Sequence, residues 1–211
     1  MIQKKILTCV FAFSSVFCVA QGNVYRDSIQ SYIDNYIEHH DVVIGDDKKY
    51  LRFFTPDSSY NIKARFKKIN DGHWFSMETS GRIKKTFRVY GIAEFRIHDT
   101  VATLSLYQSQ DLMQDSRYNR YLFLPFTDKT TGIESYHTGR YLDFAMDDIQ
   151  NGILNIDFNK AYNPSCAYVS GKYNCPVPPP ENNLPVAIKA GEMNFGKKEW
   201  PVKVDIEPGI R

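Results

Sequence analysis

Short segments rich in β-branched and aromatic residues fill the chain between residues 50 and 159, and turn residues separate them. The segments are 50–54, 60–69, 73–78, 84–90, 92–98, 101–107, 120–126, 135–144 and 153–159. Turn signals between them include Asp71-Gly72, Ser80-Gly81 and Asn151-Gly152. Strands that recur about every ten residues are typical of antiparallel sandwiches and barrels. We therefore predict a mostly β fold, an antiparallel barrel or sandwich.

One amphipathic helix is predicted before the strands, from Tyr25 to His40. Ile29, Ile33 and Ile37 recur at intervals of four residues, which places them on one helical face. Asp27 or Ser28 can cap the start of the helix by accepting hydrogen bonds from free backbone N–H groups.

Residues 1–20 have the features of a secretory signal peptide. Lys4 and Lys5 supply the positive charge, and residues 6–16 form the apolar run. Cys18 and Ala20 are small residues at the −3 and −1 positions of a cut before Gln21. A lipoprotein cut before Cys18 fits less well, because bulky Phe17 precedes it. An uncleaved anchor is the other alternative, but the run is short for a membrane span. We therefore expect an exported protein, periplasmic or secreted, with a single β-rich domain at residues 21–211.

Removal of the signal peptide changes the charge and the cysteine count. The 26 basic residues become 24 and face 24 acidic ones, so the net charge is zero. A balanced charge gives no reason to expect nucleic-acid binding. Four cysteines become two, Cys166 and Cys175. In an oxidising compartment this pair most simply forms a disulfide, with reduced cysteines as the alternative.

The composition changes after Ala161, where six prolines fall within 22 residues, from Pro164 to Pro185. Proline fixes φ and removes a backbone donor, which excludes a long regular element here. We predict a proline-rich C-terminal strap that lies over an edge of the sheet, carries a functional site, or does both.

Two predicted strands carry polar residues on one face. Asn155, Asp157 and Asn159 alternate with Leu154, Ile156 and Phe158, and Tyr141 and Asp143 share one face of the preceding strand. If these strands pair through residues 147–152, Asp143 and Asp157 approach each other, and paired carboxylates can divide the acid and base roles of a hydrolase. The alternatives are an ordinary solvated strand face or carboxylates that fasten the strap.

Other chemistry finds no support in the sequence. The nucleophile-elbow, zinc-protease, dinucleotide and P-loop motifs are absent, and the five histidines are scattered. We therefore predict no metal and no cofactor.

Several blocks of the chain resemble a known family. They include FLPFTDKTTG at 123–132, DFNKAYNP at 157–164, and the shorter blocks 139–142, 166–168, 174–176, 179–182 and 190–192. These resemble the signature blocks of the bacterial and archaeal domain-of-unknown-function family 1684. The resemblance implies no activity. It marks as motif positions Asp128, Tyr136, Arg140, Tyr141, Asp157, Asn159, Tyr162, Asn163, Cys166, Cys175, Glu181, Asn182 and Glu192. The chain departs from the family at Asn183, where an arginine is expected.

Together these features predict a polar pocket between the 135–144 and 153–159 strands, roofed by residues 161–192. We expect it to bind a small polar or carbohydrate-like ligand, because convergent polar groups beside a rigid loop are typical of ligand sites. The expected ligand contacts are Arg140, Tyr141, Asp157, Asn159, Tyr162, Asn163, Glu181 and Asn182. A hydrolase that uses Asp143, Asp157 or Glu181 is the second hypothesis, and a structural or assembly protein without a ligand is the third.

Overall fold

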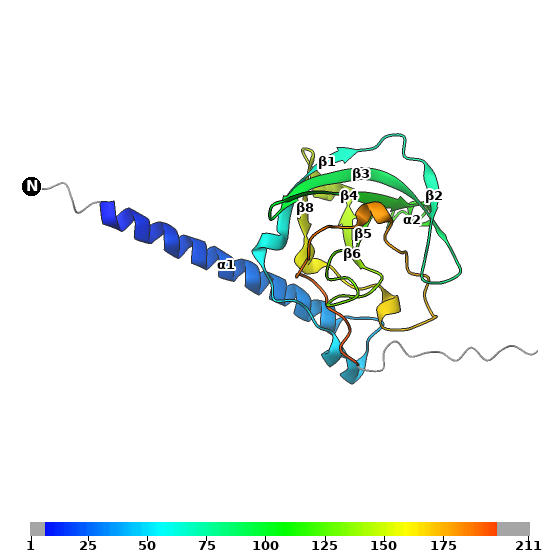
Figure 1. Ribbon diagram of the computed structural model, residues 1–211, viewed down its shortest axis with the longest axis horizontal. Coiled ribbons are helices and arrows are strands. Elements are labelled where there is room, and N and C mark those ends of the chain that lie inside the picture. The colour runs from blue at the N-terminus through cyan, green and yellow to red at the C-terminus, as the bar shows by residue number, and fades with distance from the viewer. Residues whose placement is uncertain (1–6, 198–211) are drawn as a thin grey trace, which may run out of the picture.

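An eight-stranded antiparallel sheet forms most of the protein, of which the computed structural model describes residues 7–197. The strand order is β6-β5-β4-β3-β1-β8-β7, with β2 paired to β3 outside this path. The strands are β1 (Asn61–Lys68), β2 (Trp74–Met77), β3 (Lys85–Ile97), β4 (Thr100–Ser109), β5 (Tyr121–Phe126), β6 (Arg140–Ala145), β7 (Ile149–Gln150) and β8 (Ile153–Asp157). The sheet curls strongly (Figure 1). The predicted mostly antiparallel β fold is confirmed, but the sheet does not close into a barrel.

The strand boundaries differ from the predicted ones where the chain bends. The segments predicted at 84–90 and 92–98 form one strand, β3, with a bulge between Val89 and Gly91. A Cβ at Gly91 would lie 2.8 Å from the Lys67 carbonyl oxygen, so this glycine permits close strand pairing rather than a turn. The segment predicted at 50–54 contributes one isolated bridge, from Phe53 to Glu192. The predicted turn at Asn151-Gly152 is confirmed, since both residues have positive φ.

The main core lies on the concave face of the sheet. Alternate residues of β1, β3, β4, β5 and β8 point into it, as the period of a strand requires. They include Ile62, Ala64 and Phe66 of β1, Leu104 and Leu106 of β4, and Leu154 and Ile156 of β8. The chain after β8 fills the open side with Phe158, Ala161, Leu184, Ile188 and Ala190. This C-terminal segment is therefore part of the core.

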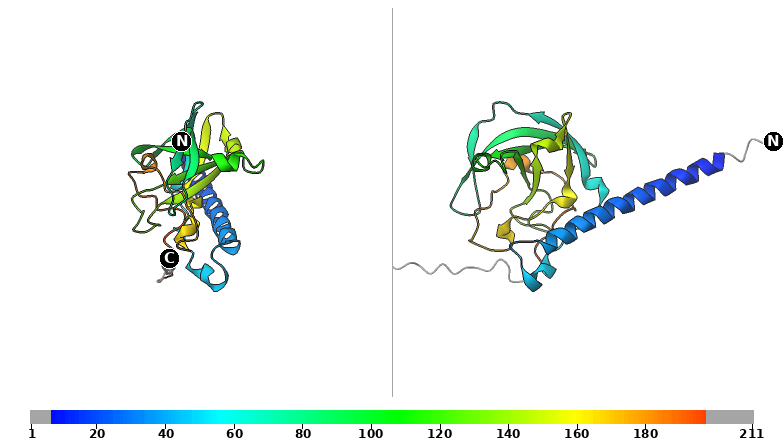
Figure 2. Two further views of the ribbon diagram at one scale, coloured as in Figure 1. Left: turned by 90° about the vertical axis from the view of Figure 1, so that its right-hand side faces the viewer. Right: turned by 180° about the vertical axis from the view of Figure 1, so that it is seen from behind.

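The long helix α1 (Leu7–Glu38) precedes the sheet and includes most of the segment predicted as a helix from Tyr25 to His40, but it ends at Glu38 and does not begin at the predicted caps Asp27 and Ser28. Its N-terminal half projects away from the sheet, and its C-terminal half lies against it (Figures 1 and 2). Ile29 and Ile33 are buried at this contact. The predicted signal peptide overlaps residues 7–20 of α1, and its first six residues lie outside the described residues.

The segment after β8 is irregular between short 3-10 turns, as its prolines require. The turns are η4 (Phe158–Lys160), η5 (Ser165–Ala167) and η6 (Pro180–Asn182). Isolated bridges tie this segment to the sheet domain at Thr79–Pro176, Thr127–Asn183 and Tyr141–Tyr162. Residues 161–197 are called the strap below. Through these bridges the strap connects regions far apart in the sequence.

Candidate functional site

The two sheet edges approach each other without pairing, and the gap between β6 and β8 is the candidate site. The predicted pairing of these two strands is wrong: β6 pairs with β5, and β8 pairs with β1 and β7. After β6 the chain turns through η3 (Met146–Asp148), and the two-residue strand β7 then occupies the free edge of β8. One backbone bridge, between Tyr141 and Tyr162, joins the two sides.

A cleft of about 760 Å³ occupies this gap, and we call it the seam cleft. Three acids line it, Asp143, Asp148 and Asp157, together with the lysines Lys63 and Lys160. The amides of Gln150, Asn151 and Asn155 and the rings of Tyr32, Phe144 and Tyr162 complete most of its wall. Its volume falls within the range usual for small-molecule sites. The sequence analysis placed Asp143, Asp157 and Tyr162 near one another, and the structure brings all three to this cleft.

Asp143 is held by two phenols. Its Oδ1 accepts hydrogen bonds from the Tyr121 hydroxyl at 2.5 Å and the Tyr162 hydroxyl at 2.8 Å. Partial burial among aromatic rings raises the pKa of Asp143, and the two phenol hydrogen bonds oppose that shift. Burial and the neighbouring carboxylate also raise the pKa values of both phenols. The phenols therefore stay protonated and act as donors, which fixes the Asp143 carboxylate at the cleft wall.

Asp157 has a different environment, because it fastens α1 to the sheet. Both of its oxygens accept from the Tyr25 hydroxyl, at 3.0 and 3.1 Å. Its Oδ1 also accepts from the backbone N–H of Asn159 and from Nδ2 of that residue. Asn159 in turn bonds both backbone groups of Asp57. Asp157 is only 8% exposed. Its carboxylate lines the cleft, but its oxygens already accept hydrogen bonds from Tyr25 and Asn159.

The N-terminal helix covers one side of the cleft through Tyr32. The Tyr32 hydroxyl donates to the Lys160 carbonyl oxygen at 3.3 Å, and the Lys160 ammonium lies 5.5 Å from the centroid of the Tyr32 ring. Burial, with the charge of Asp143 next in importance, raises the pKa of Tyr32 to about 12. The helix therefore contributes a neutral phenol to the site.

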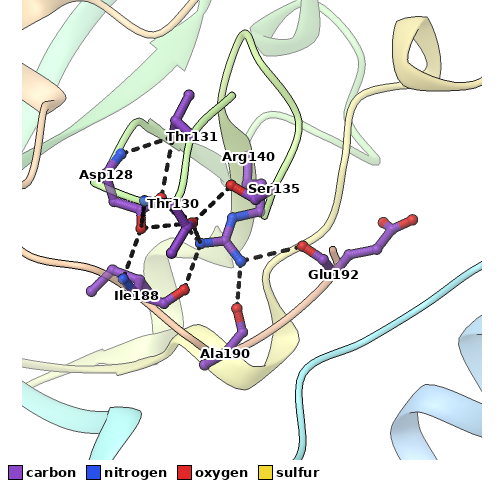
Figure 3. Close-up of polar contacts among 8 residues, drawn as sticks. All are labelled: Asp128, Thr130, Thr131, Ser135, Arg140, Ile188, Ala190 and Glu192. Atoms are coloured by element: carbon purple, nitrogen blue, oxygen red, sulfur yellow. Dashed lines mark hydrogen bonds and ion pairs between the residues drawn. The ribbon is translucent and has the colours of Figure 1, made fainter. Parts of the chain in front are cut away.

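Arg140, one of the predicted ligand contacts, lies elsewhere, in a buried cluster of its own (Figure 3). It is 0% exposed, and its Nη2 contacts the Asp128 carboxylate at 3.1 Å. The guanidinium also donates to the backbone carbonyls of Ile188, Ala190 and Glu192. Burial lowers the pKa of Arg140, and Asp128 opposes that shift. This arginine fastens the end of the strap and does not reach the cleft.

Asp128 completes the same cluster. It accepts from the backbone N–H and hydroxyl of Thr130 and from the backbone N–H of Ile188 at 2.7 Å. The Thr130 hydroxyl lies 2.8 Å from that of Ser135 (Figure 3). Removal of one partner from a buried ion pair strongly destabilises the folded protein, because it leaves the other charge buried without compensation.

The buried carboxylate of Glu192 lies at the contact between the strap and α1. It accepts from the Tyr168 hydroxyl at 2.5 Å, from the backbone N–H of Asn163 at 2.8 Å and from the Tyr36 hydroxyl at 3.3 Å. Complete burial raises the pKa of Glu192 to about 7. Asn163, predicted as a ligand contact, instead also donates from its side chain to the Met193 carbonyl.

The remaining predicted contacts also fasten the strap. The Tyr141 hydroxyl donates to the Pro176 carbonyl. The side chain of Asn182 accepts from the backbone N–H of Ser105 and donates to the carbonyls of Ser105 and Pro125. It therefore connects the backbones of β4 and β5. The exposed carboxylate of Glu181 accepts from the Tyr107 hydroxyl at 2.8 Å, away from the cleft.

Cys166 and Cys175 form the predicted disulfide, with an S–S distance of 2.03 Å. Closure of so short a loop removes unfolded-state freedom worth about 2–3 kcal/mol. Within residues 7–197, no three His, Cys, Asp or Glu side chains are arranged to hold a metal ion. In the same range, no helix has the length and apolar character needed to cross a membrane.

Several cleft residues are not predicted from the sequence, among them Tyr32, Lys63 and Lys160. Lys63 occupies a polar position of β1 and pairs with Asn155 of β8. The alternation of polar residues in segment 60–69 marks Lys63 as facing away from the core, but nothing local identifies β8 as its neighbour. Tyr32 lies outside the apolar stripe of the helix, and only the docked position of α1 brings it to the cleft.

Comparisons with other proteins agree on the fold and name no activity. A family model described as "Protein of unknown function (DUF1684)" matches residues 48–193, more than half of the chain. The solution NMR structure of an uncharacterized protein from gene locus rrnAC0354 of Haloarcula marismortui is similar, with 30% sequence identity and a TM-score of 0.60. That similarity covers 81% of this chain and 95% of the other. The comparison with curated proteins gave no match.

Proposed function

This chain belongs to the DUF1684 family of proteins of unknown function, and we propose that it is an exported protein that binds a small polar or carbohydrate-like ligand in the seam cleft. One observation carries the proposal. The cleft lies where the curled sheet fails to close, and acids, lysines, amides and phenols from five separate parts of the chain meet there. Convergence of this kind is typical of ligand sites.

The composition of the cleft favours a neutral ligand that carries several hydroxyl groups. A hydroxyl both donates and accepts hydrogen bonds, so one type of group satisfies Asp143 as well as Lys63 and Lys160. A strongly charged ligand of either sign would meet side chains that repel it, because three acids and two lysines line the cleft. The rings of Tyr32 and Phe144 offer apolar surface for the carbon skeleton of such a ligand.

The positions of the contacts between α1 and the rest of the protein support export with cleavage before Gln21. Among the side chains of α1 that the structure describes, from residue 23 onward, Tyr25, Tyr32 and Tyr36 make hydrogen bonds to the sheet and strap, and these three residues lie beyond the proposed cut before Gln21. Cleavage would therefore leave the docked part of the helix in place. The disulfide is also consistent with an oxidising compartment. Mass spectrometry of the protein from its host should find Gln21 as the first residue, and an intact N-terminus would contradict the proposal.

A thermal-shift screen tests ligand binding. The purified protein is heated with hexoses, disaccharides, sugar acids and nucleosides, and we expect at least one hydroxyl-rich compound to raise the midpoint. Asp143→Asn keeps the shape of the side chain but removes its charge, so the shift should decrease at least severalfold. Asp99→Asn, at the exposed turn between β3 and β4, is the matched control and should leave the shift unchanged.

Two outcomes of this screen would contradict ligand binding in the seam cleft. If no compound shifts the midpoint, or if the shift is equal in wild type and Asp143→Asn, the seam cleft is not the site. The third hypothesis, a structural or assembly role, would then account for the molecule, because Arg140, Asn163 and Asn182 already serve to hold the strap.

Hydrolysis with Asp143 and Asp157 is the second candidate, and one observation favours it. Both carboxylates line the same cleft, and burial favours the protonated form of Asp143, as a general acid requires. The four hydrogen bonds that Asp157 accepts from Tyr25 and Asn159 count against it as the second catalytic group. Release of nitrophenol from nitrophenyl glycosides by wild type, lost in Asp143→Asn, would support hydrolysis over binding alone.

A further inference from the structure

A second cavity, of about 360 Å³, lies on the opposite face of the sheet from the main core. Six aromatic residues line much of it: Phe87, Tyr121, Phe123, Tyr141, Tyr162 and Tyr173. We call it the aromatic pocket. Pro176 of the strap and Leu112 of the short helix α2 (Gln110–Met113) form parts of its rim.

The floor of the aromatic pocket is a preformed stack of rings. Phe87 and Phe123 are stacked with their centroids 5.7 Å apart, and Phe123 meets Tyr141 edge to face at 4.7 Å. All three are at most 5% exposed, so their packing holds them in place. A rigid surface of this kind is ready to receive another flat ring in an offset or edge-to-face contact.

Three of the tyrosines that line this pocket have hydroxyls that already bond within the protein. The hydroxyls of Tyr121 and Tyr162 both donate to Asp143, and that of Tyr141 donates to the Pro176 carbonyl. Each of these three hydroxyls therefore already donates its hydrogen bond to an acceptor within the protein. Beside polar side chains such as Lys85, Asp111 and Asn174, the walls of the pocket offer apolar and aromatic surface, which favours a planar group.

The aromatic pocket and the seam cleft share a wall. Tyr162 lines both cavities, Asp143 lines the cleft, and Tyr121 lines the pocket. The two hydrogen bonds to Asp143 link these three residues into the partition between a polar cavity and an aromatic one. One ligand with two chemically different parts would suit such a pair of cavities.

We propose that the aromatic pocket binds a planar aromatic ring, and that the ligand of the seam cleft carries this ring as a substituent, as an aryl glycoside does. The second half of this proposal rests on the proposed function, whereas the first half does not. The tests below separate the two.

Phenol tests the ring site alone, because it has no part that needs the seam cleft. Saturation-transfer NMR should detect its binding to the wild-type protein, and titration should give the dissociation constant. Leu112→Trp places a bulky ring at the rim and should weaken phenol binding at least tenfold. Met113→Trp, one position along α2 and outside the pocket lining, is the matched control and should bind phenol as wild type does.

A second variant guards against misfolding of the first. Tyr173→Ala removes a half-buried wall residue from the strap side, and it should also weaken phenol binding while circular dichroism remains unchanged. Absence of phenol binding to wild type, or equal binding in Leu112→Trp and Met113→Trp, would overturn the ring site.

Phenyl and methyl glycosides of the same hexoses test the link between the cavities. We expect at least one phenyl glycoside to bind at least tenfold more tightly than its methyl counterpart, and Leu112→Trp to abolish that difference. If phenol binds but no glycoside does, the ring site stands and the carbohydrate-like ligand of the seam cleft falls. If methyl and phenyl glycosides bind equally, the seam cleft stands and the shared ligand is refuted.

Discussion

Arg140 is a buried cation that contacts one carboxylate, the Thr130 hydroxyl and three backbone carbonyls of the strap. Along β6, Arg140 shares a face with Leu142 and Phe144, and its expected role as a ligand contact comes from its place among the motif positions of the resembled family. Asp128 and Glu192 are also motif positions of the resembled family, and the structure places both beside Arg140. A buried charge position cannot be recognised from alternation alone, because alternation fixes the face and not what covers it.

Removal of the Arg140 side chain should be strongly destabilising. Arg140→Ala leaves Asp128 buried without its cation, and a broken buried pair costs about 3–5 kcal/mol. Urea unfolding measures this loss. Arg65→Ala is the control, since Arg65 pairs with Glu94 on the surface and should cost less than about 1 kcal/mol. Equal losses in the two variants would contradict the proposed role of Arg140.

Glu192 should make stability depend on pH. Burial raises its pKa from 4.5 to about 7, so between these values the folded protein binds more protons than the unfolded chain. Its contribution is therefore fully present below pH 4.5 and is lost as the pH rises through 7, by up to about 3 kcal/mol. Glu192→Gln cannot ionise and removes this dependence.

Urea unfolding of both proteins from pH 5 to pH 8 checks this prediction. The difference in unfolding free energy between wild type and Glu192→Gln should move against wild type as the pH rises. The other ionisable groups at this carboxylate, Tyr36 and Tyr168, stay protonated throughout the range because burial raises their pKa values as well. A difference that does not vary with pH would contradict the assignment.

At the scale of elements, local sequence predicted the strands well and their partners poorly. The hairpin of β3 and β4 and the Asn151-Gly152 turn follow from local turn chemistry. The pairing of β1 with β8 joins residues about ninety positions apart, and no local signal specifies it. This one long-range pairing decides that β6 and β8 face each other across a cleft instead of forming a hairpin.

Two glycines of the strap with positive φ differ in their surroundings. A Cβ at Gly191 would lie 2.6 Å from the Ala161 carbonyl oxygen, whereas Gly171 has nothing within 4 Å. Gly171→Ala should cost about 1 kcal/mol from backbone strain alone. Gly191→Ala should cost at least about 2 kcal/mol more, because the strap cannot then approach η4. Thermal unfolding of both variants measures the difference, and similar midpoints would show that the strap does not pack this tightly.

At the scale of the whole molecule, the candidate site exists because five separate parts of the chain meet at the sheet opening, three of which supply its central acid and phenols. β6 supplies Asp143, the strap supplies Tyr162, and α1 supplies Tyr32. The polar alternation of 141–143 and 155–159 predicted the location of the cleft. It could not predict that Asn159 and Asp157 serve to dock α1, because the helix and β8 lie more than 100 residues apart in the sequence.

The central claim is that a ligand binds between β6 and β8, and its most direct test is a crystal structure of the protein with the compound that gives the largest shift in the thermal screen. The account predicts electron density for that compound in the seam cleft, with a hydrogen bond to Asp143 and contacts to Tyr32. Density on another face of the molecule, with the seam cleft holding only water, would contradict it.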